Sequence, residues 1–201
     1  MTGLAAVAIA YLLGSIPFGL LIVKLMTGRD VRSTGSGNIG ATNVLRAAGR
    51  IAGVLTLLLD AAKGAAAVCL ADWLTGGSDL WMSMAALAVL LGHAFSVWLK
   101  FDGGKAVASF VGAFAVLTPL PLLAVVVVFV LLLVRTRYLS LGSIVAAGLF
   151  PLACWMILHP DWPVLLAATA AAVLIIWRHR GNLERLRAGN ERVFRFGQSK
   201  S

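Results

Sequence analysis

Apolar and polar segments alternate along the chain. A transmembrane helix needs roughly 20 consecutive apolar residues, and five of the apolar segments reach or nearly reach that length. The fourth and fifth are shorter and are separated by Thr118-Pro119-Leu120-Pro121. They form either one kinked helix, which gives six spans, or two short helices, which gives seven. The seven apolar segments are 4–23, 51–71, 80–99, 106–117, 120–134, 139–158 and 162–177.

The charges between these segments decide the number of spans. Every Lys and Arg except Lys63 lies in residues 24–50, 100–105, 135–137 or 178–201. The segments 72–79, 118–121 and 159–163 contain no Lys or Arg and include three Asp residues. Basic loops face the cytoplasm, and only seven spans place all four basic segments on one side. The sequence therefore predicts an all-α polytopic bundle of seven transmembrane helices, with its N-terminus outside and its C-terminus inside.

Composition supports this class. The 201 residues are 60% hydrophobic and 12% charged, whereas soluble domains are about 45–50% apolar and about 25% charged. We attribute the net charge of +9 to membrane topology and headgroup contact and expect no nucleic-acid partner. Cys69 and Cys154 lie inside apolar segments without metal-ligand spacing, so we expect neither a metal nor a cofactor. We expect residues 1–201 to form one membrane domain whose first span is retained.

The first polar cluster is a glycine-rich loop at residues 33–43, STGSGNIGATN. Its glycines permit positive φ, and consecutive backbone N–H groups in such a loop form an anion-binding nest. Thr42 or Asn43 can cap a short helix whose N-terminus also favours an anion. The two flanking arginines, Arg32 and Arg46, add positive charge. The alternative is a flexible polar connector.

The second and third clusters lie near the second and third apolar segments. Asp60 and Lys63 are three residues apart, so they share a helix face and can form an ion pair. Ionisable residues at membrane depth indicate function, although a purely structural ion pair remains an alternative. The turn Gly103-Gly104-Lys105 supplies backbone donors and an ammonium beside a helix N-terminus, which suits phosphate. The complete nucleotide-binding P-loop sequence is absent, and His93 has either a binding or a structural role.

The last clusters surround Ser143, just inside the sixth apolar segment, and His179 and Asn182, in the C-terminal basic segment. Their arginines are also explained by topology or by a basic membrane-surface tail. All five clusters are predicted on the cytoplasmic side, and all favour anions. The residues alone therefore predict a membrane protein that binds phosphorylated, lipid-like ligands at its inner face.

Five stretches, in the order GSIPFG, GSGNIGATNVLR, DAAKG, GHAFSVWLKFDGGKAVAS and HRGNLERLRAGNE, resemble the bacterial acyl-phosphate:glycerol-3-phosphate acyltransferases, the PlsY family. The resemblance covers essentially the whole chain. It implies transfer of a fatty acyl group from acyl phosphate to the 1-hydroxyl of glycerol 3-phosphate, which yields lysophosphatidic acid, the first step of bacterial phospholipid synthesis. It also implies a site on the cytoplasmic face of the bacterial inner membrane, membrane lipids as neighbours and, as a possible partner, a soluble enzyme that makes acyl phosphate.

The resemblance also assigns roles by motif position. The catalytic residues would be Ser36, Lys105, His179 and Asn182. Gly37 and Asn38 would join Ser36 and Lys105 at the phosphate of acyl phosphate, while Arg46, Ser143, His179 and Asn182 would hold glycerol 3-phosphate. Lys63 and Asn43 would support them, and we also expect Thr42, His93, Gly103 and Gly104 to contribute to substrate binding. The family mechanism is substrate-assisted: the donor phosphate accepts the proton of the attacking hydroxyl, and no covalent enzyme intermediate forms.

This chain departs from the family at four positions of the third motif. Ser96, Asp102, Ala106 and Ser109 stand where the family usually has Pro, Lys, Gly and Thr. Asp102 replaces a positive charge beside the Gly-Gly-Lys turn. The residues also suggest two other classes of protein. One is a transporter of phosphorylated metabolites, which the lack of basic residues in the outer loops disfavours; the other is a non-catalytic scaffold, which leaves the glycine loop and Lys63 unexplained.

Overall fold

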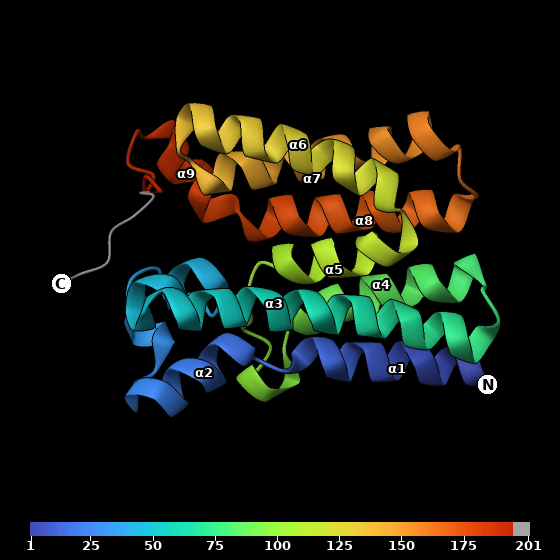
Figure 1. Ribbon diagram of the computed structural model, residues 1–201, viewed down its shortest axis with the longest axis horizontal. Helices are drawn as coiled ribbons and strands as arrows, with labels where there is room; N and C mark the ends of the chain where they lie inside the picture. Colours follow the sequence, from blue (N-terminus) through green and yellow to red (C-terminus); the bar gives the residue numbers. More distant parts are fainter. Residues whose placement is uncertain (195–201) are drawn as a thin grey trace. The chain divides into compact units, whose positions relative to one another are not determined.

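In the computed structural model, residues 1–194 are described and are helical, with turns and loops between the helices (Figure 1). The last residues of the predicted basic tail, 195–201, lie outside the described part. The chain divides into two compact units, Met1–Val116 and Leu117–Ser201. The first unit contains the α-helices α1 (Thr2–Ser15), α2 (Phe18–Thr27), α3 (Ala41–Thr75), α4 (Asp79–Ala94) and α5 (Val107–Leu117), with short 3-10 turns at Val31–Ser33 and Val97–Leu99.

Close packing of small residues holds the first unit together. α1 packs on α4 and α3, and a Cβ atom added at Gly14 would overlap the backbone of Val89 in α4. α3 and α5 approach each other in the same way, because a Cβ at Gly64 would overlap the carbonyl oxygen of Ser109 and one at Gly112 that of Ala61. Small residues let helix backbones come together where lipid offers no hydrophobic drive for association. This packing places α5 directly against the charged segment of α3.

Two of the long helices are interrupted. α1 and α2 are separated by Ile16, whose backbone is extended, and Pro17, whose backbone is also non-helical. α3 changes direction at Gly49, where φ is 87° and ψ is −177°. The first part of α3 folds back so closely that a Cβ at Gly53 would meet Leu45. The predicted second span, 51–71, corresponds to the part of α3 that follows this break.

The second unit contains α6 (Pro119–Thr136), α7 (Leu139–Leu158), α8 (Trp162–Arg178) and α9 (Arg180–Arg187). α7 packs on both α6 and α8, and α9 contacts α7 and α8. α9 was not predicted; it is bent by 56° from α8 at His179. The two short apolar segments are two separate helices, α5 and α6, with Thr118 in a non-helical conformation between them.

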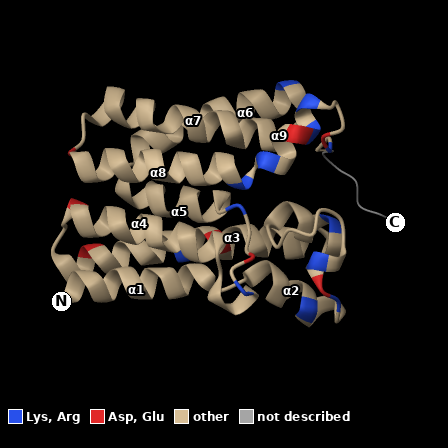
Figure 2. Ribbon diagram, turned by 180° about the vertical axis from the view of Figure 1, so that it is seen from behind, with Lys and Arg blue, Asp and Glu red and all other residues tan. Residues whose placement is uncertain are grey.

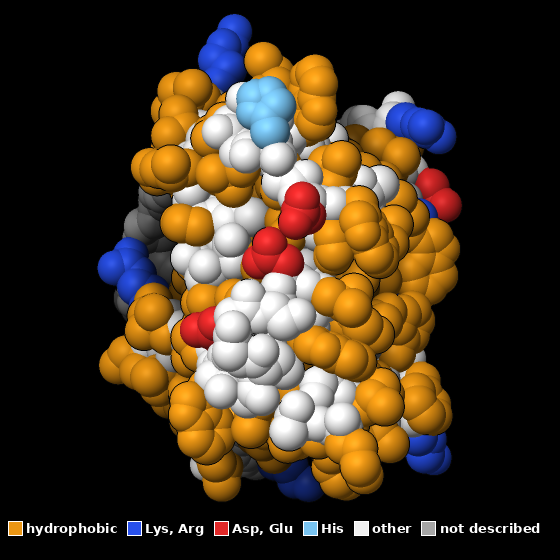
Figure 3. Space-filling model, turned by 90° about the vertical axis from the view of Figure 1, so that its right-hand side faces the viewer, with side chains coloured by type: hydrophobic (Ala, Val, Ile, Leu, Met, Phe, Trp, Pro, Cys, Tyr) orange, Lys and Arg blue, Asp and Glu red, His pale blue; other side chains and the backbone are white. Residues whose placement is uncertain are grey.

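The apolar helices agree with a membrane protein. Within residues 1–194, five helical segments are long and apolar enough to cross a membrane, with α1 and α2 counted together as one; the number is six if the bent pair of α8 and α9 is also one span. α5 is an apolar helix of 11 residues, below that length. Large hydrophobic side chains are exposed along these helices, and hydrophobic atoms cover much of the surface in Figure 3. A surface of this kind is stable in contact with lipid.

Charged residues are separated along the helices within each unit (Figure 2). In the first unit, Lys and Arg gather where α2 ends and α3 begins, whereas Asp72 and Asp79 lie at the turn between α3 and α4. In the second unit, the arginines lie at the turn between α6 and α7 and around α9, and Asp161 lies at the turn between α7 and α8. Each unit therefore has one end rich in positive charge and one without it.

Candidate functional site

Asn43 organises the glycine-rich loop. Its side-chain oxygen accepts a hydrogen bond from the backbone N–H of Ser36 at 3.0 Å. Its amide nitrogen lies 3.1, 3.0 and 2.9 Å from the carbonyl oxygens of Val31, Thr34 and Asn38. Asn43 is only 2% exposed, so one buried carboxamide holds together residues from both ends of the loop.

This arrangement corrects two details of the sequence-based interpretation. The N–H groups of Ser36 and Gly37 bond to Asn43 and to the carbonyl oxygen of Thr34, so they do not form the predicted open nest. Neither Thr42 nor Asn43 caps a helix, because α3 begins at Ala41 and Gly40 is its N-cap. The side chain of Ser36 remains exposed, and its hydroxyl is the group through which this residue can meet an anion.

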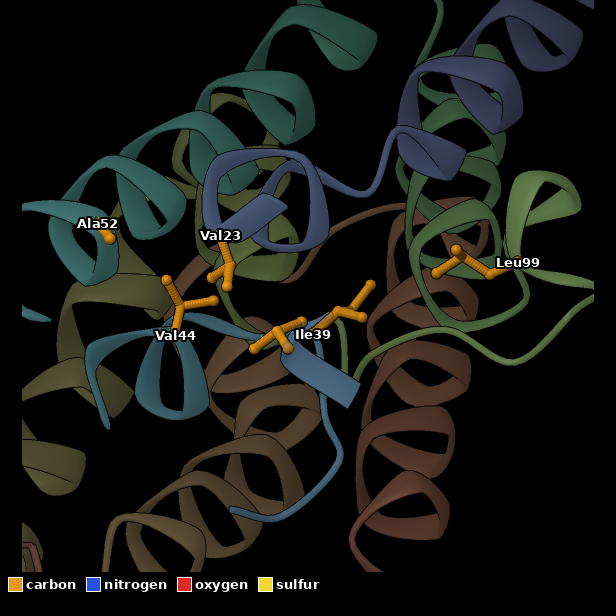
Figure 4. Close-up of a cluster of buried hydrophobic side chains, with 6 residues drawn as sticks. Val23, Ile39, Val44, Ala52 and Leu99 are labelled. Atoms are coloured by element: carbon orange, nitrogen blue, oxygen red, sulfur yellow. The ribbon is translucent and has the colours of Figure 1, made fainter. Parts of the chain in front are cut away.

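A buried hydrophobic cluster anchors the glycine-rich loop to the helices next to it (Figure 4). Ile39 from the loop packs with side chains of α2, α3 and the turn at Val97–Leu99. A Cβ at Gly19 in α2 would overlap the carbonyl oxygen of Ile39, so the loop also lies directly on a helix. The cluster consists of Val23, Val31, Ile39, Val44, Ala52 and Leu99.

An exposed ion pair lies at the start of the same loop. Arg32 donates to Asp30 through Nη2 at 2.6 Å. This hydrogen bond lowers the pKa of Asp30 below its ordinary value and raises that of Arg32. The negative charge of Asp102 also raises the pKa of Arg32, although less than Asp30 does. The unusual carboxylate beside the Gly-Gly-Lys turn thus acts on an arginine of the glycine loop.

The Gly-Gly-Lys turn is built against the end of α4. The N–H groups of Gly103 and Gly104 donate to the carbonyl oxygens of Ala94 and His93 at 3.1 and 2.9 Å. A Cβ at Gly104 would overlap the imidazole ring of His93. Both glycines are therefore needed for close packing, and their N–H groups hold the turn rather than a ligand. Lys105, the next residue, is half-buried.

The predicted pair of Asp60 and Lys63 is confirmed, with Oδ1 and Nζ 2.8 Å apart although not in hydrogen-bond geometry. Both side chains are 3% exposed. Lys63 Nζ donates to the carbonyl oxygen of Ile16 at 2.8 Å and lies 5.6 Å from the centre of the Phe18 ring. The ammonium therefore contacts residues on both sides of the break between α1 and α2.

The same carboxylate faces His93. Asp60 Oδ1 lies 3.6 Å from Nδ1 of His93, and Ser109 Oγ lies 3.2 Å from the same nitrogen. A Ser-His-Asp catalytic triad uses the two opposite nitrogens of the imidazole, whereas here both groups meet Nδ1. These three side chains therefore do not form an activated nucleophile.

In the second unit, His179 occupies the bend between α8 and α9. Its Nδ1 lies 2.8 Å from the carbonyl oxygen of Ile175. A carbonyl oxygen only accepts hydrogen bonds, so Nδ1 carries a proton and Nε2 is the acceptor nitrogen of the neutral ring. His179 is 3% exposed, and this contact fixes the orientation of its ring.

Glu191 gathers the other polar groups of this unit. It accepts hydrogen bonds from Asn182 at 2.7 Å, from Ser140 at 3.1 Å and from Arg185 at 2.9 Å. Burial raises the pKa of Glu191, but the bonds from Asn182 and Ser140 and the charge of Arg185 outweigh it, so the pKa lies below its ordinary value. Ser143, one helical turn after Ser140, donates to its own helix at Leu139.

The remaining predicted residues lie at or near the surface of the first unit. Arg46 is exposed in the first part of α3, and Asn38 and Thr42, which precede it in the chain, are half-buried. Asn38 accepts from the N–H of Gly40 at 2.8 Å. In residues 1–194 no group of three or more His, Cys, Asp or Glu side chains is placed to hold a metal ion.

A model of the glycerol-3-phosphate acyltransferase family matches residues 4–189. The chain belongs to this acyltransferase family. A glycerol-3-phosphate acyltransferase of Trichlorobacter lovleyi is 50% identical over 96% of this acyltransferase and 98% of its own length. One of Geobacter sulfurreducens is 45% identical over 94% of this chain and 95% of its own.

Two crystal structures of PlsY (YgiH), an integral membrane glycerol 3-phosphate acyltransferase, are also similar to this acyltransferase. The glycerol 3-phosphate form has a TM-score of 0.92 at 40% identity and covers 97% of this chain and 96% of its own. The lysophosphatidic acid form has a TM-score of 0.89 at 38% identity with the same coverage. The chain is therefore similar in both sequence and fold to membrane acyltransferases.

Three polar residues of the acyltransferase were not predicted as part of the site: Ser109, Ser140 and Glu191. Glu191 ends the stretch AGNE and is an acid in a strongly basic segment, which was a usable signal. Ser109 is hidden in an apolar helix, and only the packing of α5 on α3 shows its contact with His93.

Proposed function

We propose that this chain transfers an acyl group from acyl phosphate to the 1-hydroxyl of glycerol 3-phosphate. The identity of the acyl acceptor is supported by the two PlsY crystal forms, one with glycerol 3-phosphate and one with lysophosphatidic acid. The second compound is the first with one acyl chain added, so the two forms represent an acceptor and its acylated product.

The donor is inferred from the chemistry of the side chains. Ser109, which contacts His93, shares Nδ1 of that ring with Asp60 and is not activated. Direct transfer to glycerol 3-phosphate then needs a donor that is already activated, and an acyl phosphate meets this requirement. The hydroxyl oxygen attacks the acyl carbon, the bond between that carbon and the phosphate oxygen breaks, and the hydroxyl proton moves to the departing phosphate. The protein contributes proximity and electrostatic stabilisation.

The residues divide between the two phosphates. The side chains of Ser36, Asn38 and Lys105 hold the phosphate of the donor, with Lys105 neutralising the charge that develops as it leaves. Gly37, whose N–H bonds to the Thr34 carbonyl oxygen, shapes the loop through its positive φ. Arg46, Ser143, His179 and Asn182 hold glycerol 3-phosphate. In the neutral ring His179 presents Nε2 as an acceptor, which suits a substrate hydroxyl. Thr42, Gly103 and Gly104 shape these two groups.

The orientation in the membrane follows from charge. We propose seven spans, with α5 as a short fourth one, the basic ends of both units in the cytoplasm and the N-terminus outside. The family match extends over both compact units, which supports one acyltransferase domain in a bacterial inner membrane. Single cysteines introduced at residues 76 and 136 in a cysteine-free background should label from opposite sides; labelling from the same side contradicts the seven-span topology.

The central test measures phosphate release from acyl phosphate by the purified protein in detergent. Release should require glycerol 3-phosphate and should match the lysophosphatidic acid formed. An acyl thioester offered as the donor should give no product. Thioester use, or phosphate release unrelated to glycerol 3-phosphate, would overturn the proposed reaction.

Two lysines provide a matched comparison for the phosphate site. Lys105→Gln should lower kcat/KM for acyl phosphate by about 100-fold, the order expected when a stabilising group is lost from a transition state. Lys100→Gln removes the same charge from an exposed position five residues earlier and should change kcat/KM less than about threefold. Equal effects of the two substitutions would refute a specific role of Lys105.

A fourth experiment separates binding from general-base catalysis at His179. If the donor phosphate accepts the proton, His179→Gln should raise KM for glycerol 3-phosphate and leave the pH dependence of kcat in place. A positioned general base contributes about 10²–10⁴-fold. If His179→Gln lowered kcat by that factor and also removed a titration near neutral pH, His179 would be a general base and the substrate-assisted mechanism would be wrong.

A further inference from the structure

Asp60 and Lys63 form an ion pair within a largely apolar segment of α3, and the proposed reaction does not explain their position. Isolated charges at this depth are costly and point to function. The Lys63 ammonium already contacts a carboxylate, the Ile16 carbonyl oxygen and the Phe18 ring. With 3% of its side chain exposed, it is enclosed by protein groups rather than directed to a ligand.

A continuous set of contacts leads from this pair to the Gly-Gly-Lys turn. The 3.6 Å from Asp60 Oδ1 to His93 Nδ1 is too long for a hydrogen bond but brings the carboxylate charge to the ring. Ser109 contacts the same nitrogen from α5. The ring then packs against Gly104, and the His93 carbonyl oxygen accepts the Gly104 N–H. Lys105 is the next residue along the chain.

We propose that Asp60 and Lys63 are positioning residues that act through His93 to hold the turn at residues 103–105, and that neither binds substrate. The inference rests on the proposed function in one respect, that Lys105 contacts the donor phosphate. Lys63 links the Asp60 carboxylate to the break between α1 and α2, and Asp60 orients the His93 imidazole. The imidazole packs against Gly104 and thereby fixes the position of the turn. Three helices and the turn thereby share one buried polar connection.

The charge of the pair provides a way to separate positioning from folding. Removing one partner leaves an uncompensated buried charge and is strongly destabilising, whereas replacing both partners by neutral groups is often neutral or stabilising. The double variant Asp60→Asn/Lys63→Met therefore keeps the volume and removes both charges. If the pair had only a structural role, this variant should recover both stability and activity.

The experiment compares KM values of the full-length purified enzyme. For the double variant we expect KM for acyl phosphate to rise about tenfold, less than the roughly 100-fold that a misplacement of a reacting or binding group by about 1 Å can cost. KM for glycerol 3-phosphate should change less than twofold. Ser83→Ala is the matched control, because Ser83 is a buried polar residue of the same helix as His93 whose hydroxyl has no hydrogen-bond partner; its KM values should equal those of the wild type.

Ser109 provides an independent test if the double variant does not fold. Ser109→Ala removes one of the groups on Nδ1 and should raise KM for acyl phosphate about threefold, taking one hydrogen bond as about 0.5–1.5 kcal/mol. Ser109→Thr keeps the hydroxyl and should restore the wild-type value. Wild-type KM for acyl phosphate in a folded double variant overturns the inference, and so does wild-type KM in Ser109→Ala. If wild-type enzyme does not use acyl phosphate at all, the proposed function fails instead.

Discussion

The carboxamide of Asn43 allows a near-isosteric test of how the glycine-rich loop is held. Asn43→Asp keeps the size and shape of the side chain and keeps an oxygen for the Ser36 N–H. It removes both amide protons, which lie among three carbonyl oxygens at 2.9–3.1 Å. A carboxylate at this position would face those oxygens with negative charge and no donor.

The magnitude follows from the contacts. Two lost hydrogen bonds cost about 1 kcal/mol each, and a buried carbonyl left without its donor costs about 1–3 kcal/mol. We therefore expect Asn43→Asp to destabilise the protein by about 4 kcal/mol, the sum of these losses. At about 2–4 °C per kcal/mol for a chain of this size, the aspartate variant should lose about 10 °C in Tm.

Thermal unfolding in detergent and steady-state kinetics together check this expectation. Where enough folded protein remains, KM for acyl phosphate should rise, because Ser36 and Asn38 are held by the same side chain. Asn190→Asp introduces the same carboxylate at an exposed residue and should leave Tm within about 2 °C. The reasoning would be refuted if Asn43→Asp unfolded within 2 °C of the wild type, since the carboxamide would then not hold the loop.

Three further expectations concern stability. Because the pKa of Glu191 is lowered in the folded protein, the ionised carboxylate stabilises the fold above pH 4.5, and this stabilisation is lost as pH falls through the folded pKa. When Tm is measured at decreasing pH, the Tm of Glu191→Gln should therefore fall less than that of the wild type. Ala106 has a φ of 59°, so Ala106→Gly should remove about 1–2 kcal/mol of left-handed backbone strain. It also loses a buried methyl group worth about 0.8 kcal/mol and increases the conformational freedom of the unfolded chain. Because these effects nearly cancel, Tm should stay within about 3 °C of the wild type, and a shift beyond 6 °C would contradict this balance. Ser96 has φ of −63°, which suits proline, so Ser96→Pro should cost only the 2.6 Å hydrogen bond to Ser15, about 1 kcal/mol, and should be more stable than Ser96→Ala, which lacks the rigid ring.

Much of the helical framework could be read from the sequence because membrane partitioning acts on local composition. The segment predicted at 139–158 coincides with α7, and the one at 162–177 matches α8 to within one residue. The break at Gly49 was not predicted, because a single glycine in a helical pattern does not reveal which way its backbone turns. α9 was missed because it is short and strongly charged, so no apolar pattern marks it.

The candidate site was predictable where residues interact along one helix. Asp60 and Lys63 are three residues apart, and helix geometry alone brings them together. The nest at Ser36 and Gly37 could not be judged in this way, because the group that uses the Ser36 N–H is the side chain of Asn43, seven residues later. Contacts such as that of Ser109 with His93 depend on how α5 packs against α3 and α4, which no local pattern contains.

The spacing of Asp60 and Lys63 also matters for how the chain enters the bilayer during synthesis. A charged residue at the centre of a nascent helix costs about 2.5–3.5 kcal/mol on insertion. Because these two residues are on one face of α3, they can neutralise each other as soon as that helix forms, before α4 or α5 has been made. Insertion of α3 then needs no partner helix, whereas the contacts with Ile16 and His93 belong to later assembly. A change to either residue therefore affects biogenesis as well as the finished enzyme, and the amount of protein in the membrane should be measured beside its kinetics.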